Sequence, residues 1–376
     1  MAVEAAGGAP ARQQLIRSLN EQLLLDYIRG AGKISRPDLA RMSRLSKPTV
    51  SLALANLERA GLIRTSGLKT GAPGRAALLY EVRPETGAVL ALDAGSEFLR
   101  GAVSDLSGAV RARSTVRTAA TTGHERVAEL HRLAKSLCGD AGIDLADVTQ
   151  TVLGSPGVHD PNRDALRMAG ALPQWDEPSV LAELRTAFGP ALRLENDVNA
   201  AALAEQRWGA ARDAGSVVYV TVGTGIGGGA VVNGRPVHGL AHPEMGHARI
   251  PHDRTADPFA GACPHHGDCW EGLAAAPALA ARWGVPPQSL PDDHPAWALE
   301  AHYLALGLAN IILTLSPERL VLGGGVLARS GLLERVRIDV RRLIGGYMPS
   351  GEIVAPMLGD RSGVLGALAL AADLAR

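Results

Sequence analysis

Aromatic side chains make up only 3% of the 376-residue chain, and cysteine occurs only at Cys138, Cys263 and Cys269. Proteins that bind single-stranded nucleic acid stack exposed rings on the bases, so this shortage argues against that class. Three cysteines cannot form a disulfide framework and are typical of a reducing compartment. The first residues show no charged leader before an apolar segment, and the longest apolar run, Tyr303–Leu315, is shorter than the roughly 20 residues that a bilayer requires. We therefore expect a cytoplasmic protein without a membrane partner.

Neither sign of charge is in excess overall, because 38 basic and 38 acidic residues balance. The balance hides an asymmetry: residues 1–85 hold 13 basic and 7 acidic residues, whereas residues 86–376 hold 25 and 31. A basic first quarter in front of an acidic remainder predicts a nucleic-acid-binding module joined to a unit with a different partner. The length agrees with two or three domains.

The first quarter follows the pattern of a small DNA-binding domain over residues 15–83, after a flexible N-terminus of residues 1–14. Ser35 and Ser46 each precede a helical pattern and are followed two residues later by a proline in the first turn. Two such short helices after a first one are typical of a helix-turn-helix, whose second helix enters the major groove of DNA. An ordinary three-helix packing domain is the alternative.

The outer face of the predicted third helix carries the residue types that DNA recognition uses. Lys47, at the helix start, is placed for phosphate, Leu52 suits a thymine methyl group, and Asn56 can pair with adenine. A loop rich in glycine and proline follows between two short strands and reads as a wing, with basic side chains at its tip. The residues predicted to contact DNA are Ser46, Lys47, Thr49, Leu52, Asn56, Lys69 and Arg75.

A turn-rich boundary at residues 83–87 precedes a long segment in which buried-strand patterns alternate with helices, the pattern of an α/β domain. Strands are expected at Val89–Leu92, Leu99–Ser104, Val110–Arg113, Thr151–Leu153, Leu192–Leu194 and Arg319–Leu322, and helices at His124–Leu137, Pro178–Phe188 and Trp297–Ser316. The broad apolar face of the last helix suits either a core or a subunit contact, and we favour the core.

Several motifs in this segment occur in a recognisable order. They are Glu195-Asn196-Asp197-Val198-Asn199, the glycine loop 223–229, Pro243-Glu244-Met245-Gly246-His247, and the cysteine–histidine segment 263–272. With them the chain resembles the ROK family of repressors and kinases, specifically its winged-helix repressor branch, over nearly its whole length. The resemblance implies an actin-like α/β fold of two lobes closing on a cleft. Lobe 1 would be residues 87–198 with the C-terminal helix, about 362–376, and lobe 2 residues 199–361.

The resemblance also implies a sugar site between the lobes. Its sugar-binding residues would be Gly157, Asn196, Asp197, Glu244, His247 and Glu271. In a kinase, Asp197 would be the general base, because a hydroxyl that attacks a phosphoryl group needs a carboxylate to accept its proton. The simpler interpretation of Asp197 is a carboxylate at the start of a helix.

A metal site is predicted at Cys263-x-x-His266-x-x-Cys269, with His247 as the fourth ligand. Two thiolates and two imidazoles suit the closed tetrahedron of structural Zn²⁺. Most of the family has C-x-C-G-x-x-G-C there, and this chain has the variant of fructokinase-like members. His265 is a rival third ligand, and two reduced thiols beside a surface histidine pair are the alternative to a metal site. Because His247 belongs to both predicted sites, zinc would orient the imidazole that meets the sugar.

The first phosphate loop departs from the kinase pattern Asp-x-Gly-Gly-Thr-Lys or Arg. After Asp93 this chain has Ser96, Glu97 and Phe98 at the positions that would meet phosphate, so an anion and a ring replace a hydroxyl and a cation. The glycine clusters 223–229 and 323–325 are intact. We therefore expect no bound nucleotide and no catalytic residue.

These features together predict a sugar-responsive repressor. It would bind a palindromic operator as a homodimer or homotetramer and respond to a sugar or sugar phosphate. An ATP-dependent sugar kinase that retains a DNA-binding module is the main alternative, and an activator that needs sugar to bind DNA is another.

Overall fold

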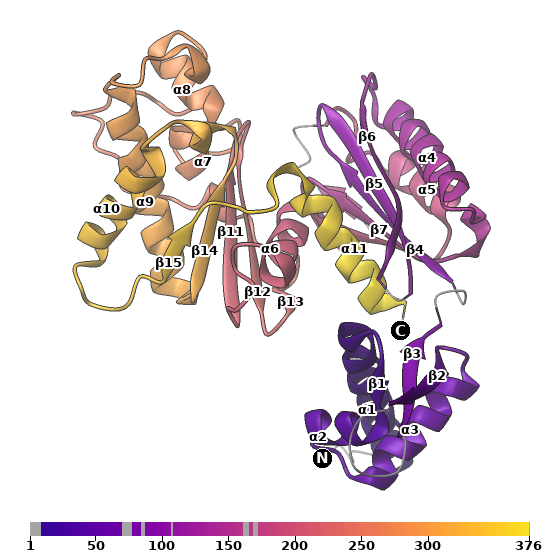
Figure 1. The fold of residues 1–376 in the computed structure, drawn as a ribbon. Helices are drawn as coiled ribbons and strands as arrows, with labels where there is room; N and C mark the ends of the chain where they lie inside the picture. Colours follow the sequence, from indigo (N-terminus) through magenta and orange to yellow (C-terminus); the bar gives the residue numbers. More distant parts are fainter. Residues whose placement is uncertain are drawn as a thin grey trace, which may run out of the picture.

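The computed structural model describes residues 9–69, 77–83, 87–106, 108–160, 165–167 and 172–375. The chain forms a small N-terminal domain, here called the head, and two α/β lobes (Figure 1). The head lies below lobe 1, and two helices from distant parts of the sequence lie between the lobes.

The head is a winged-helix arrangement of three helices and a three-stranded sheet in the order β1-β3-β2. Its elements are α1 (Ala9–Ala31), β1 (Ile34–Ser35), α2 (Arg36–Ser43), α3 (Lys47–Arg59), β2 (Ile63–Lys69) and β3 (Ala77–Val82). Both predicted caps are confirmed: the Ser35 hydroxyl accepts a hydrogen bond from the Asp38 N–H, and the Ser46 hydroxyl accepts one from the Thr49 N–H. The caps fix where α2 and α3 begin, so α3 presents one face to solvent while its apolar face packs on α1 and α2.

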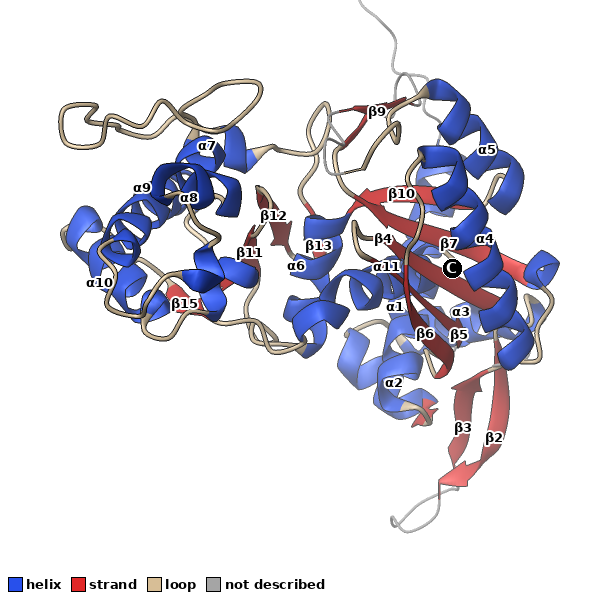
Figure 2. Cartoon of the chain, turned by 90° about the horizontal axis from the view of Figure 1, so that it is seen from above, coloured by secondary structure: helices blue, strands red, loops and turns tan. Residues whose placement is uncertain are grey.

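Lobe 1 is built on a five-stranded sheet in the order β10-β7-β4-β5-β6. The strands are β4 (Ala88–Ala94), β5 (Phe98–Asp105), β6 (Val110–Arg117), β7 (Val148–Ser155) and β10 (Leu192–Asn196), with a side hairpin of β8 (Val158–Asp160) and β9 (Ala165–Arg167). Helices α4 (Gly123–Asp140) and α5 (Pro178–Phe188) cover one face and α11 (Ser362–Leu374) the other (Figure 2). Because β4, β7 and β10 are parallel, their carboxyl ends meet at one edge, where Asp93 and Asn196 lie.

Lobe 2 has a second five-stranded sheet in the order β13-β12-β11-β14-β15. Its strands are β11 (Ser216–Val222), β12 (Ile226–Val232), β13 (Arg235–Pro236), β14 (Arg319–Gly323) and β15 (Glu352–Val354), and its helices are α7 (Trp270–Ala274), α8 (Ala276–Trp283), α9 (Ala296–Leu315) and α10 (Leu332–Ile344). Helix α9 is long and apolar enough to cross a membrane by length and composition alone, but most of its central side chains are buried in the core of this lobe. The core interpretation of this helix is confirmed.

Helices α6 (Asp197–Trp208) and α11 lie against each other between the two sheets. A side chain at Gly366 of α11 would place its Cβ 1.7 Å from the Ala200 carbonyl oxygen of α6, so only glycine allows this approach. Helix α6 also packs on β11 and β12 of lobe 2, while α11 packs on β4 and β7 of lobe 1. This pair of helices therefore joins the lobes.

The head is docked on α11. Buried side chains of α1, such as Leu24 and Ile28, belong to the same apolar cluster as Leu368 of α11. At the edge of that contact, Nη1 of Arg29 donates a hydrogen bond to the Ala372 carbonyl oxygen at 3.2 Å. The last turn of α11 therefore touches the head directly.

Candidate functional site

Asn196 and Asp197 lie at the junction of β10 and α6. The Asn196 side chain caps α6, since its Oδ1 accepts hydrogen bonds from the N–H groups of Val198 at 2.9 Å and Asn199 at 3.3 Å. Its Nδ2 donates to the Gly157 carbonyl oxygen at 3.1 Å. The structure thus brings Asn196 and Gly157 together, and Asn196 fixes both the start of α6 and the loop after β7.

Two carboxyl groups meet at this junction. Burial raises the pKa of Asp197, although the Val198 N–H, 2.9 Å from Oδ1, stabilises the charged form. Asp93, at the end of β4, has its pKa raised to about 7, first by burial and then by the negative charge of Asp197. The two side chains therefore share one poorly solvated space at the carboxyl edge of the sheet.

Lobe 2 contributes Glu244 and Glu271 to the same space. Burial, Glu271 and Asp197 together raise the pKa of Glu244 to about 7. Glu271 is held by the Ile226 N–H, 3.0 Å from its Oε2, and a side chain at Gly225 would clash with this carboxylate. Gathered carboxylates with unfilled acceptor positions suit a ligand that offers several hydroxyl donors.

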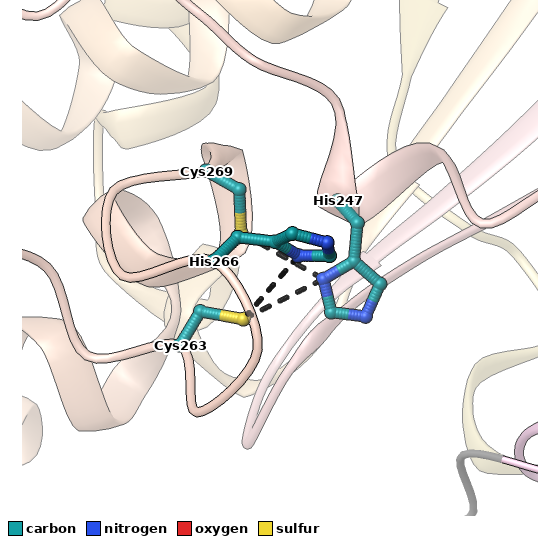
Figure 3. Close-up of side chains that lie close together, drawn as sticks. All are labelled: His247, Cys263, His266 and Cys269. Carbon is teal, nitrogen blue, oxygen red and sulfur yellow. Dashed lines mark hydrogen bonds between the residues drawn. The ribbon is translucent and has the colours of Figure 1, made fainter.

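The predicted metal ligands lie together (Figure 3). One nitrogen or sulfur atom from each of His247, Cys263, His266 and Cys269 lies within 4.8 Å of the others. Nδ1 of His247 is 3.6 Å from the Cys263 sulfur and 3.7 Å from the Cys269 sulfur, and a tetrahedral zinc with usual bond lengths would separate sulfur and nitrogen by about 3.6 Å. These four donors therefore fit a metal ion.

His265 does not belong to this group. Its ring lies 5.8 Å from that of His247, centroid to centroid, whereas the His266 ring lies at 4.9 Å and its Nδ1 is 3.9 Å from the Cys263 sulfur. Backbone hydrogen bonds between Cys263 and Gly267 in both directions close a tight turn. The turn explains why ligands three residues apart can face one centre.

His247 links the metal cluster to the carboxylate space. Its Nδ1 faces the two sulfur atoms and lies 4.0 Å from Oε1 of Glu271. An imidazole bound to a metal through one nitrogen has its other nitrogen available for a hydrogen bond. A metal bound through Nδ1 would therefore leave Nε2 of His247 for a second contact, which is compatible with the double role that the family resemblance implied.

The altered phosphate loop faces a cavity of about 820 Å³ between the lobes. Glu97 lines it from lobe 1, and Gly223, Thr224 and Gly325 of the two intact glycine clusters line it from lobe 2. The cavity therefore lies where the glycine loops of the two lobes face each other, with a carboxylate at its lobe 1 wall. Ser96 beside Glu97 is exposed, and the Phe98 ring lies 5.6 Å from the Arg100 guanidinium.

Arg100 is a residue that the sequence analysis missed. Its Nη1 is 3.5 Å from Oδ2 of Asp93, and its Nη2 is 3.3 Å from Oδ2 of Asp360. The signal was present in the hairpin register, because Asp93 and Arg100 are direct partners across β4 and β5. The Arg100 guanidinium therefore lies against the Asp93 carboxyl group, so Asp93 is not a free carboxylate.

The residues predicted to contact DNA differ in their surroundings. Ser46 and Lys47 at the start of α3 are exposed, Thr49 is half-buried, and Leu52 is 50% exposed, so all four are at least partly accessible to solvent. Asn56 instead donates from Nδ2 to Oε1 of Glu21 at 2.6 Å, and its Oδ1 accepts from Arg59 at 3.1 Å. The structure thus commits the Asn56 side chain to contacts within the head. The Lys69 side chain and Arg75 lie outside the described residues.

Comparisons with known proteins agree with both parts of this architecture. The ROK family model matches residues 89–374, and a winged helix-turn-helix DNA-binding model matches residues 17–64. The fructokinase of Zymomonas mobilis is 44% identical over 211 residues, which are 53% of this chain and 68% of the relative. The xylose repressor of Bacillus spizizenii is 25% identical over 381 residues, 95% of each chain.

Among solved structures, a ROK family transcriptional regulator homologous to the E. coli Mlc protein superposes with a TM-score of 0.76 and 21% identity, covering 96% of this chain and 97% of the other. That likeness shows the fold of the whole chain, the head included. The fold class expected from the sequence, a winged helix-turn-helix followed by an actin-like two-lobed domain, is confirmed. The chain belongs to the ROK family and carries a winged helix-turn-helix DNA-binding domain in front of the two lobes.

Proposed function

We propose that this protein is a sugar-responsive transcriptional repressor of genes for carbohydrate use. One observation carries the proposal: the carboxylate space between the lobes and the DNA-binding head occur in one chain that aligns from end to end with a xylose repressor. Lysine and serine at the start of α3 would meet phosphates, and Leu52 would meet base edges in the major groove.

The effector would bind between the lobes. Asp197, Glu244 and Glu271 would accept hydrogen bonds from sugar hydroxyls, His247 would add one more contact, and Asn196 would hold Gly157 in place beside them. The fructokinase relative has the higher identity, so fructose is the first effector we propose and xylose the second. A sugar phosphate is the third, because the sequence resemblance leaves both forms open.

The signal would pass through the two central helices. Sugar would draw Glu244 of lobe 2 toward Asp197, which is the first residue of α6, and α6 packs along α11. Near their other ends, Nη1 of Arg207 donates to Oδ1 of Asp373 at 3.1 Å, and a second hydrogen bond joins the same two side chains. One residue before Asp373, the Ala372 carbonyl oxygen accepts a hydrogen bond from Arg29 of the head. A change in lobe closure would thus change the seating of the head.

Zn²⁺ is the metal we propose for the cluster of His247, Cys263, His266 and Cys269. The donor set of two thiolates and two imidazoles favours zinc over hard cations, and the separations fit its tetrahedron. Bound there, the ion would be structural: it would close the loop 263–269 and fix the His247 ring beside Glu271.

We further propose that the protein does not transfer phosphate. Glu97 places a negative charge in the cavity that nucleotide phosphates would need, and Arg100 engages Asp93. The fructokinase relative supports the second candidate function, an ATP-dependent sugar kinase in which Asp197 would be the general base. A kinase assay with Mg-ATP and fructose, xylose or glucose distinguishes the repressor from the kinase. Turnover above about one per second would be ordinary for a kinase and would support that function.

The test of the repressor role is a gel shift with the DNA upstream of the protein's own gene, with and without each sugar. We expect binding to a palindromic site by a homodimer or homotetramer, in the cytoplasm, with release by the effector. Binding that requires the sugar would make the protein an activator. Failure to bind any duplex DNA would remove the DNA-binding half of the proposal.

A further inference from the structure

A second cavity, of about 580 Å³, lies beside β10 and is separate from the carboxylate space. It is walled by residues of β7, β8, α5 and β10 from lobe 1, by β13 and the loop after it from lobe 2, and by the C-terminal end of α11. Asn196 is its one residue in common with the proposed sugar site, and none of Asp197, Glu244, His247 and Glu271 lines it. Its volume is within the usual range for small-molecule pockets, about 300 to 1,000 Å³.

Charged side chains of both signs line this cavity. Arg185 and Arg193 line it, and Nη1 of Arg185 donates to the Leu192 carbonyl oxygen at 2.5 Å, which fixes that guanidinium at the wall. Glu195 also lines the cavity, and its carboxylate is held in place: Oε1 accepts hydrogen bonds from the Asn196 N–H at 2.8 Å and Asn199 Nδ2 at 3.0 Å, and Nε2 of His238 lies 3.1 Å from it. A hydrogen bond with Glu195 raises the pKa of His238 and so favours its charged form.

Arg193 is the side chain that a ligand would reach first. It is exposed on the edge strand β10, and within the described part of the chain its guanidinium makes no hydrogen bond or ion pair. A guanidinium presents paired N–H donors in a planar fork that matches a carboxylate or a phosphate.

The rest of the wall is apolar. Val152, Leu194 and Pro236 line the cavity together with Leu370 and Leu374 of α11, and Leu374 is 49% exposed. A hydroxyl-rich sugar would leave these side chains without apolar partners, whereas a ligand with a ring or a short aliphatic body would cover them.

We propose that this cavity binds a small organic anion whose carboxylate or phosphate meets Arg193 and whose apolar body covers Leu370 and Leu374. Such a ligand is a second effector, because it touches the turn of α11 whose Ala372 carbonyl oxygen holds Arg29 of the head. Binding at this cavity does not depend on the sugar response proposed above; only the effect on operator DNA does.

The binding test uses the full chain with benzoate and phenyl phosphate as probes, benzyl alcohol as the neutral analogue, and equal ionic strength throughout. The variant is Arg193→Gln, and the matched control is Arg113→Gln, an exposed arginine on β6 at the opposite edge of the same sheet. We expect at least one anion to bind the natural protein and the control, and to bind Arg193→Gln at least tenfold more weakly by calorimetry. Equal binding to both variants, equal binding of benzyl alcohol, or no binding of either anion overturns the site.

The effector role is tested separately with the anion that binds and the operator fragment. We expect operator affinity to change at least threefold in the natural protein and in Arg113→Gln, and to stay constant in Arg193→Gln. An unchanged operator affinity in the natural protein overturns the effector role. Fructose added together with the anion should give additive thermal stabilisation, and mutual exclusion of the two would show that the anion occupies the sugar site instead.

Discussion

At the scale of single residues, the carboxyl groups between the lobes have an energetic cost that their ligand would offset. Burial raises the pKa of Asp93, Asp197 and Glu244, and neighbouring negative charge raises the pKa of Asp93 and Glu244 further. Hydroxyl donors from a sugar would stabilise the charged forms. Buried carboxyl groups weaken the empty fold where their oxygens lack donors, and a bound sugar would supply such donors.

Asp197→Asn should abolish the sugar response and leave operator binding intact. The change removes one charged acceptor while keeping shape, and a hydrogen bond to a charged group contributes about 1.5 to 3 kcal/mol, so sugar affinity should fall about 10- to 100-fold. Calorimetry with fructose and gel shifts measure the two properties. Asp213→Asn, an exposed aspartate shortly after α6, is the control and should change neither. Loss of operator binding in Asp197→Asn would make this residue a structural one.

Asp93→Asn should stabilise the protein at alkaline pH. The pKa of Asp93 is raised from 3.8 to about 7 in the folded chain, so folding is relatively favoured while the carboxyl is protonated, and this advantage is lost as pH rises from about 4 to 7. Asparagine does not ionise, so the variant is spared this loss of unfolding free energy. From the difference between the two pKa values, the loss is at most about 4 kcal/mol. Thermal denaturation should show a higher melting temperature for the variant at pH 8 and a shrinking difference toward pH 4. A variant that melts lower at pH 8 would contradict the assignment of a buried charge.

At the scale of elements, the loop 263–269 holds the proposed metal-binding side chains, and the helix pair α6–α11 holds the contact proposed to carry the signal. Cys269→Ser should remove bound zinc, counted as one ion per chain by elemental analysis, and weaken fructose binding, because His247 would lose its orientation. Cys138→Ser, a buried cysteine of α4 far from the cluster, is the control and should retain the metal. Full zinc in Cys269→Ser would remove this cysteine from the ligand set.

The Arg207–Asp373 contact is expected to transmit the signal and not to bind either ligand. Both side chains are half-buried, and such a pair contributes on the order of 1 kcal/mol, equivalent to about fivefold in the sugar-induced drop in operator affinity. Arg207→Gln should reduce that drop while sugar affinity and sugar-free operator affinity change little, and Arg207→Lys should retain most of it. Arg212→Gln, just beyond α6, is the control. An unaltered drop in Arg207→Gln would exclude this route.

Sequence patterns predicted the elements well where a local rule governs them. The serine caps of α2 and α3 and the buried strands of lobe 1 lie where capping and apolar runs placed them, with strand ends extended by pairing, as at β6, which continues to Arg117. The gathering of His247, Cys263, His266 and Cys269 was also predictable, since three of them are within seven residues. The surroundings of Asn56 were not predictable, because its hydrogen bond to Glu21 of α1 depends on how the two helices pack. The cavity beside β10 and the place of Arg193 in its wall were likewise not predictable, since six separate segments of the chain form that wall.

At the scale of the whole molecule, the head and the cleft are one thermodynamic system, because α11 packs on α6, on the lobe 1 sheet and on the head. If fructose lowers operator affinity by some factor, operator DNA must lower fructose affinity by the same factor. We expect a factor of about 5 to 150, the usual range for coupled sites. Calorimetric titration of fructose into free protein and into the protein–operator complex, compared with gel shifts at zero and saturating fructose, measures both sides. Salt must be held constant, because phosphate contacts make operator affinity fall steeply with ionic strength. Unequal factors would mean that fructose acts by changing the oligomeric state or by binding a second site, whereas equal factors that both fall by about fivefold in Arg207→Gln would place that share of the coupling in the contact between α6 and α11.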